Sequence, residues 1–312
     1  MRTTARGAVA VTALLLVGAG SAAPSAEATF AGDNGRVVYE QVTRHTGAPD
    51  TSDIYTAGIH GRDRVRLTTS GTATSPTWSR SGRRIAYVDQ GAVMLMARSG
   101  RNKVRVVGTG YNTSPTWAPG GRKIAFVSDR GLGAQVYVYD LRRNTTPPVT
   151  VKGRANARAG EPVWSPAGDK IAFVRDTGGQ SDLWTVRPDG TDLTRITTTD
   201  VASEMSPDWS PDGRRLVYYR YDGSGGGCVT GGIFTVRVAD GRKTEVVDTP
   251  CSDLDPRWSP DGRRIMWQVQ NGPAGGKARG AGIYTVRVNG TDRRGVLTGA
   301  NRWFEPDWQS RR

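Results

Sequence analysis

Residues 206–219 read SPDWSPDGRRLVYY, and close copies of this stretch recur along the chain. The copies are SPTWSRSGRRIAYV at 75–88, SPTWAPGGRKIAFV at 114–127, EPVWSPAGDKIAFV at 161–174 and DPRWSPDGRRIMWQ at 255–268. Aligned on their aromatic residue, with the last one near the C-terminus, the repeat tryptophans are Trp78, Trp117, Trp164, Trp209, Trp258 and Trp308, spaced by 39 to 50 residues. Self-similarity at this period is typical of tandem structural units.

Each copy has the chemistry of a strand, a tight turn and a second strand. A proline stands two residues before every repeat tryptophan, and because proline cannot donate a ladder hydrogen bond, this segment is expected at a sheet edge. A glycine recurs four residues after the tryptophan in the five complete copies, as in a type I turn followed by a left-handed residue. The apolar run that follows, such as RLVYY, predicts the next strand. The repeat tryptophans are expected to pack between neighbouring units.

A third and a fourth strand follow, for example GIFTVR and KTEVVD after the copy at 206–219. Each unit therefore predicts a four-stranded antiparallel sheet. The first unit lacks a proline-x-tryptophan strand, and the last residues, EPDWQS at 305–310, are such a strand with nothing after it. We expect an all-β, six-bladed β-propeller of four-stranded antiparallel blades, closed by the C-terminal strand pairing into the first blade.

The repeat resembles that of the TolB-type, WD-like β-propeller family, and the resemblance covers about residues 30 to 310. It is carried by SPDWSPDGRRLVYY and DPRWSPDGRRIMWQ. We expect the chain to lack the additional N-terminal domain of TolB itself and to have no room for the hydrolase domain that accompanies related propellers in prolyl oligopeptidase-like enzymes. The resemblance implies a bare propeller, a fold that hosts many functions.

The N-terminus has the layout of a secretory signal peptide. Arg2 and Arg6 precede an apolar run and small residues that end in Ala26-Glu27-Ala28. We expect a signal peptide at 1–28, a propeller at 29–312 and a secreted, extracytoplasmic protein with no integral membrane segment after processing; the alternative is a retained anchor. In that compartment Cys228 and Cys251 are expected to form a disulfide, with two unpaired thiols as the alternative.

The formal net charge is +14, yet only 6 of the 43 basic residues are lysine. This arginine bias is what a high-GC genome produces, so part of the charge is compositional. A basic surface still attracts polyanions, and weak polyanion binding is expected. The chain has no nucleic-acid-binding motif.

The predicted functional residues lie where irregular loops gather, on the face that holds the connections between second and third strands and the crossings between blades. The residue three before each repeat tryptophan is expected to ring the mouth of the central channel there. Together with nearby acids and an aromatic, the candidate ligand-binding residues are Glu161, Glu204, Asp253, Asp255, Trp303 and Glu305. They suit a cation, a basic peptide group or a sugar; alternatively, the acids cap turns or pair with arginine.

Catalytic signatures are absent from the sequence. His45 and His60 are the only histidines, neither has a partner at metal-binding spacing, and no G-x-S-x-G elbow is present. We therefore predict no catalytic residue, metal or cofactor. The predicted function is a monomeric binding scaffold for a protein, peptide or cell-envelope glycan. The alternative is a carbohydrate-active hydrolase or lyase that uses converging carboxylates at the channel mouth.

Overall fold

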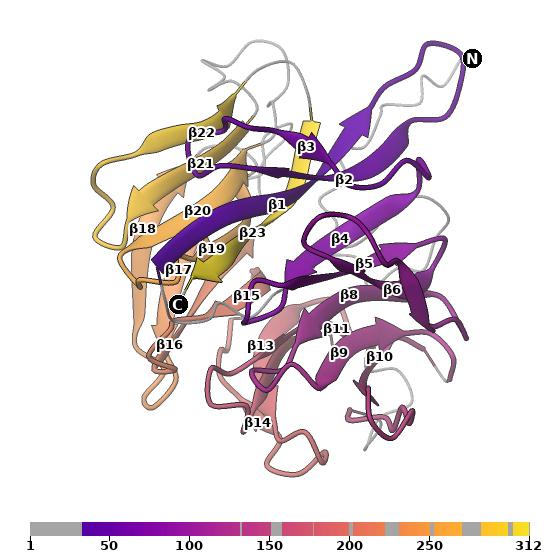
Figure 1. Cartoon of the computed structure of the whole chain (residues 1–312). Coiled ribbons are helices and arrows are strands. Elements are labelled where there is room, and N and C mark those ends of the chain that lie inside the picture. The colour runs from indigo at the N-terminus through magenta and orange to yellow at the C-terminus, as the bar shows by residue number, and fades with distance from the viewer. Residues whose placement is uncertain are drawn as a thin grey trace, which may run out of the picture.

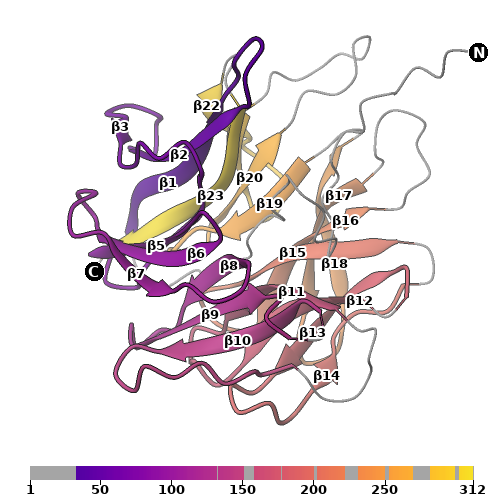
Figure 2. The same ribbon diagram turned by 90° about the vertical axis from the view of Figure 1, so that its right-hand side faces the viewer.

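A computed structural model describes residues 33–131, 133–150, 158–176, 178–199, 202–221, 231–249, 253–269, 282–298 and 302–311. These residues form six antiparallel sheets, the blades, around one axis (Figures 1 and 2). Only strands and turns occur among them, and none forms a helix long and apolar enough to cross a membrane.

The first three blades use the N-terminal part of the chain and the last strand. From the axis outward, blade one contains β23 (Arg302–Arg311), β1 (Asp33–Thr43), β2 (Thr51–Ala57) and β3 (Val65–Arg66). Blade two contains β4 (Ala73–Trp78), β5 (Arg84–Asp89), β6 (Ala92–Ala97) and β7 (Val104–Val107). Blade three contains β8 (Asn112–Trp117), β9 (Lys123–Ser128) and β10 (Gln135–Asp140).

The second half of the chain continues the order. Blade four contains β11 (Arg158–Trp164), β12 (Ile171–Asp176), β13 (Ser181–Val186) and β14 (Thr194–Arg195). Blade five contains β15 (Ser203–Trp209), β16 (Arg215–Tyr221), β17 (Gly231–Arg237) and β18 (Lys243–Thr249). Blade six contains β19 (Asp253–Trp258), β20 (Arg264–Val269), β21 (Gly282–Arg287) and β22 (Arg294–Thr298).

The predicted closure is confirmed. β23 pairs antiparallel with β1, with Trp308 opposite Val37, and in Figure 1 the yellow C-terminal strand lies against the indigo N-terminal one. The inner strands contact one another in sequence, and β23 contacts both β19 and β4, which completes the ring. Each proline-x-tryptophan segment occupies the inner edge of its sheet, as expected for a residue that cannot donate to a ladder.

The turns also form as predicted. In blade two the Gly82 amide donates to the Ser79 carbonyl (2.7 Å), and Gly82 has a φ of 62°. Gly213 and Gly262 occupy the same left-handed position in blades five and six, with φ of 69° each. Glycine fits there because it has no Cβ to clash with the backbone.

Blade three has a reduced outer edge. Beyond β10 the next segment makes only single bridges, at Thr145 and Pro148. Pro147 and Pro148 cannot donate to a ladder, so a regular fourth strand is prevented at this point.

The repeat tryptophans are buried and pack between blades, as predicted; they are 0 to 5% exposed. The indole of Trp209 in blade five donates to the carbonyl of Val163 in blade four (3.2 Å). The guanidinium of Arg84 in blade two lies over the ring of Trp117 in blade three, 4.6 Å from its centroid. Aromatic packing therefore joins neighbouring blades, whereas the backbone hydrogen-bond ladders lie within each blade.

Buried aspartates add a second kind of joint, which was not predicted from the sequence. Asp208 accepts a hydrogen bond from the backbone N–H of Trp258 in the next blade (2.7 Å), and Asp307 accepts one from Trp78 (2.8 Å). Both carboxylates are at most 1% exposed. Asp307 connects the C-terminal strand to blade two, so the ring is closed by this buried hydrogen bond as well as by the β1–β23 ladder.

We expect Asp208→Ala and Asp307→Ala each to lower the free energy of unfolding by about 2 kcal/mol or more, because each leaves a buried N–H without its acceptor. Urea unfolding followed by tryptophan fluorescence measures this loss. Glu245→Ala, which removes an exposed carboxylate from β18, is the control and should change the value by less than about 0.5 kcal/mol. Equal effects from all three substitutions would show that the aspartates are not interblade joints.

Candidate functional site

Six residues that point to the propeller axis share an unusual backbone conformation. They stand three before each repeat tryptophan and have positive φ: Ser75 (52°), Ser114 (51°), Glu161 (51°), Ser206 (52°), Asp255 (53°) and Glu305 (48°). We call this set the axial ring. A non-glycine residue in the left-handed region costs about 1 kcal/mol or more, and such strain often accompanies functional positions.

A β-bulge in every inner strand causes this conformation. In blade two, Ser75 and Pro76 together lie opposite the single residue Tyr87. The same two-against-one register occurs in the other five blades, each time opposite a buried aromatic: Tyr39, Phe126, Phe173, Tyr218 and Trp267. Proline suits the bulge because its missing N–H would have no ladder partner there.

Hydrogen bonds and charges join the members of the ring across blades. The Ser206 amide donates to Glu161 Oε2 (2.6 Å), and the Ser206 hydroxyl donates to Asp255 Oδ1 (3.1 Å). Asp255 in turn raises the pKa of Glu305 by charge repulsion, after the larger effect of burial. The closure of the chain therefore brings carboxyl groups from blades four, six and one into one electrostatic cluster.

Two further residues belong to this cluster and were not predicted from the sequence. Glu40, on β1, is 7% exposed, and its charge raises the pKa of Glu305. Arg257, two residues after Asp255 on β19, is fully buried, and its charge lowers the pKa of Asp255 and of Glu161 against the larger effect of burial. The repeat pattern does not predict either residue. Glu40 lies on the second strand of its blade, and Arg257 lies two residues after the ring position of its strand.

Burial dominates the titration of these acids. It raises the pKa of Glu161 to about 8, of Glu40 to about 7 and of Asp255 to about 6. The pKa of Glu305 is held well above its ordinary value by burial and then by the charges of Glu40 and Asp255. At neutral pH the cluster therefore retains protons and can both donate and accept hydrogen bonds.

The axial ring lies deeper than expected from the sequence. Its members are at most 4% exposed, so they line the interior of the axis rather than an open rim. The bulge accounts for this, because it lies in the body of each inner strand and not at the strand's first residue. Polar atoms remain available inside: Ser114 Oγ and the Nε and Nη2 atoms of Arg257 are buried and have no hydrogen-bond partner among the described residues.

The other predicted residues are placed differently. Glu204 is fully buried, but it pairs with Lys243 of β18 (2.9 Å), so its carboxylate serves an ion pair within blade five. Asp253 and Trp303 stand at the starts of β19 and β23, five residues before their tryptophans, and their side chains lie outside the described part of the structure. Cys228 and Cys251, the predicted disulfide, also lie outside the described residues. Within the described ranges, no three His, Cys, Asp or Glu side chains are placed to hold a metal ion.

Comparisons with known proteins agree with this architecture. Residues 90–230 match the model of the TolB beta propeller domain family. The structure is similar to that of TolB from Acinetobacter baumannii, with 18% identity, a TM-score of 0.74 and coverage of 89% of this chain and 67% of that one. No curated protein sequence matches the chain.

Two other solved structures share the fold. A candidate TolB of Agrobacterium tumefaciens is 16% identical, with a TM-score of 0.65 and coverage of 89% of this chain and 99% of that one. An oligogalacturonate lyase from Vibrio parahaemolyticus is 15% identical, with a TM-score of 0.58 and coverage of 79% of this chain and 71% of that one. At these identities the likeness concerns the fold alone.

Proposed function

Since this chain carries the TolB-type β-propeller repeat, we propose that it is an exported interaction scaffold that binds a protein, a peptide or a cell-envelope glycan. The proposed binding surface is the loop face, where the second and third strands of each blade are connected and where the chain crosses between blades. A TolB-like propeller supports protein interaction in general. The class of partner and the export of the chain are what this proposal adds to that general role.

The observation that supports this site best is the coupled group of carboxyls on the axis. Glu161, Asp255 and Glu305 are joined through Ser206 and through their charges, with Glu40 beside them. Four acidic groups against one buried arginine favour a positively charged group, such as an ammonium or guanidinium, entering along the axis from the loop face, because a bound cation would stabilise the ionised carboxylates and so release the protons that they hold. The unpartnered hydroxyl of Ser114 adds a hydrogen-bonding position for the same ligand.

Export rests on the N-terminal sequence. The basic start, the apolar run and the Ala26-Glu27-Ala28 site are typical of a cleaved secretory signal. An exported propeller meets envelope proteins, peptides and glycans, so the proposed location and the proposed ligands agree. N-terminal sequencing of the secreted protein would test this part, and a first residue near Thr29 is the expected result.

We expect the double variant Glu161→Gln/Glu305→Gln to bind a cationic peptide at least about tenfold more weakly than the wild-type chain, because it removes two of the acids that would ionise opposite the bound cation. Fluorescence anisotropy with labelled tetralysine measures this change. Glu245→Gln removes an exposed acid from the outer strand β18 and is the matched control. An equal loss in both variants would contradict the axial site, since affinity would then follow net charge alone.

The same double variant separates the proposal from its alternative, a carbohydrate-active hydrolase or lyase. A scaffold changes its affinity and has no turnover to lose. An enzyme that uses these carboxyls would lose turnover of a glycan substrate while keeping its binding. Incubating the wild-type protein with envelope oligosaccharides and analysing the products by mass spectrometry decides between them, and cleavage that the double variant abolishes would overturn the scaffold function.

A further inference from the structure

The opposite face of the propeller, which holds the turns between first and second strands and between third and fourth strands, has an uneven charge. We call it the turn face. In blades two and three its turn segments, 79–84, 97–105, 118–123 and 140–145, contain eleven basic residues and one acidic residue, Asp140. The corresponding segments of blades four to six, 165–170, 187–195, 210–215, 237–245, 259–264 and 287–295, contain thirteen basic and eight acidic residues.

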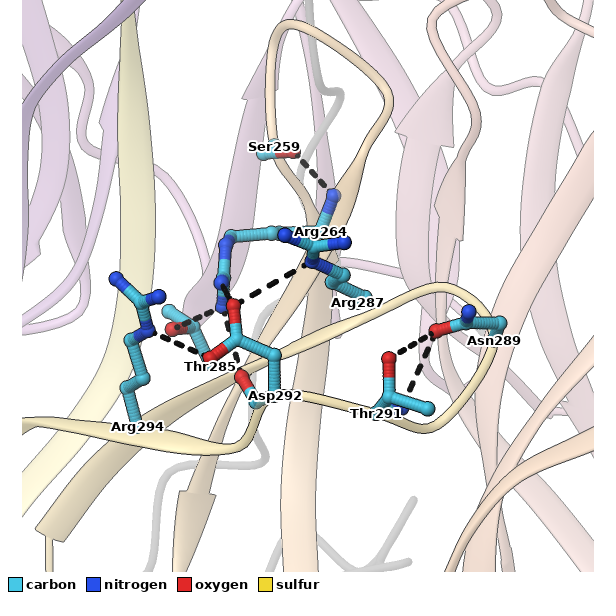
Figure 3. A network of polar contacts seen from close by, with 8 residues as sticks. All are labelled: Ser259, Arg264, Thr285, Arg287, Asn289, Thr291, Asp292 and Arg294. Atoms are coloured by element: carbon cyan, nitrogen blue, oxygen red, sulfur yellow. Dashed lines mark hydrogen bonds and ion pairs between the residues drawn. The ribbon is translucent and has the colours of Figure 1, made fainter.

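In blades four and six an aspartate pairs with the basic residues of the turns. Asp292 pairs with Arg264, with Arg287 (3.4 Å) and with Arg294 (2.8 Å), and Figure 3 shows the three guanidinium groups gathered around its carboxylate. In blade four Asp192 pairs with Lys170 at 3.3 Å. No ion pair is found in blades two and three within the described part of the chain.

Individual turn positions explain why blades two and three have fewer acidic residues on this face. Asp192 and Asp292 have left-handed φ of 55° and 56°. The equivalent residue in blade two is Asn102 (56°), so this left-handed position is kept there without the charge. Similarly, Ser81 in blade two and Gly120 in blade three occupy the turn position that Asp212 holds in blade five.

The turns of blades two and three form one continuous surface. The Arg98 amide donates to the Arg83 carbonyl (2.9 Å), which holds the two turns of blade two together. Arg84 donates to the Gly121 carbonyl (2.7 Å) in blade three and thus bridges the two blades, which are neighbours in Figure 2. Six exposed arginines define this basic patch: Arg83, Arg84, Arg98, Arg101, Arg122 and Arg142.

We propose that the basic patch binds a phosphodiester-linked polymer of the cell envelope. Closely spaced guanidinium groups without carboxylate partners create a positive potential that attracts a polyanion, and guanidinium matches phosphate oxygens in a bidentate geometry. Among the described residues, Tyr111 is the exposed large aromatic, and it lies in the crossing before β8, on the loop face. Within the described ranges the patch therefore has no stacking platform for single-stranded nucleic acid.

This inference rests on the proposed export, because an exported protein meets envelope polymers. It is separate from the axial site, since the patch lies on the opposite face. A protein held on the polymer by its turn face would leave the loop face free for its other partner.

The test is the affinity of the mature chain for poly(glycerol phosphate), measured by isothermal titration calorimetry at several salt concentrations. Ser81→Asp/Asn102→Asp/Gly120→Asp introduces acids at positions where other blades carry them, and a Cβ at position 120 would meet no atom within 4 Å. The aspartate introduced at position 81 has a precedent in blade five, where the Ser210 hydroxyl donates to Asp212 (2.5 Å). The matched control Arg214→Gln/Arg242→Gln/Arg263→Gln changes the net charge by the same amount on blades five and six.

We expect the triple-aspartate variant to bind at least about tenfold more weakly at about 150 mM salt, with a log–log salt slope shallower by about 2, while the control stays within about threefold of wild type. Arg98→Gln/Arg101→Gln/Arg122→Gln should give the same loss if the aspartate variant does not fold. The axial variant Glu161→Gln/Glu305→Gln should keep wild-type polymer affinity, which separates this inference from the proposed function.

Three results would overturn the inference. The first is equal weakening by the two triple variants, which would assign binding to net charge. The second is no detectable binding of poly(glycerol phosphate) by the wild-type chain at about 50 mM salt. The third is tighter, patch-dependent binding to duplex DNA or to vesicles containing phosphatidylglycerol, which would assign the patch to another partner.

Discussion

A chain that ends at residue 301 should fail to form the closed propeller. The deletion removes β23, which supplies the inner strand of blade one and pairs with β1. Without it β1 becomes an exposed edge, and unpaired edges favour aggregation. We expect loss of the near-ultraviolet circular dichroism of the buried tryptophans and of the cooperative thermal transition.

The expected size of this effect follows from the interactions that β23 makes with the rest of the propeller. Trp308 is 5% exposed and belongs to the core cluster that contains Val37 and Tyr39 of β1. Removing a buried aromatic of this kind costs about 3 to 5 kcal/mol, a large part of the roughly 5 to 15 kcal/mol that stabilises a typical domain. The deletion also removes the ladder to β1 and the hydrogen bond from the Trp78 amide to Asp307.

A peptide of residues 302–312 added to the truncated chain is the control. It should restore the cooperative transition by strand addition to β1, because the missing interactions are confined to this segment. If the truncated chain instead unfolds within about 2 °C of the full-length protein, the C-terminal strand does not close the ring.

The fold was predictable because its signals repeat in the sequence. The spacing of Trp78 to Trp308, the proline two residues before each tryptophan and the turn glycine specify strand order and edge position directly. The closure followed from a strand missing at one end and one in excess at the other. In blade three the prolines at 147 and 148 coincide with an outer edge that is reduced to single bridges, a local departure that the repeat pattern does not contain.

The axial cluster was predictable only in part. The position of Glu161, Asp255 and Glu305 before the proline placed them in one ring, but the bulge that turns them inward depends on the register with the next strand. Glu40 and Arg257 could not be selected, because they reach the axis from positions without a repeat pattern. The ion pair of Glu204 could not be predicted either, because its partner Lys243 lies three strands away in the same blade and no sequence pattern links the two residues.

The stability of the wild-type chain should fall as the pH rises from about 5 to about 8. Burial raises the pKa of Glu161 to about 8 in the folded state, whereas an unfolded chain gives glutamate its ordinary value. The folded state therefore binds more protons than the unfolded state in this range. A group with a raised folded pKa contributes stability that is fully present below the unfolded pKa and is lost as the pH rises through the folded pKa.

Each carboxyl that is protonated in the fold and ionised in the unfolded chain should contribute a slope of about −1.4 kcal/mol per pH unit to the free energy of unfolding. Glu40 and Asp255 add to the slope over narrower windows, because burial raises their pKa to about 7 and about 6. The turn aspartates Asp192 and Asp292 have lowered pKa values and stay ionised throughout this range, so they do not affect the slope.

Glu161→Gln isolates one member of the ring. The amide keeps an oxygen that can accept the hydrogen bond from the Ser206 amide, but it has no proton to release. We expect this variant to lose about 1.4 kcal/mol per pH unit from the slope. Glu245→Gln, the exposed control, should leave the slope unchanged.

The most direct test of the axial ring as one coupled acid site is the free energy of unfolding in urea, measured for the wild-type chain and Glu161→Gln at intervals between about pH 5 and about pH 8. A wild-type value that decreases with pH, and a clearly shallower decrease in the variant, is the predicted result. A wild-type value that stays level or increases, with the variant parallel to it, would mean that these carboxyls are ionised in the folded protein and that the buried ring does not form.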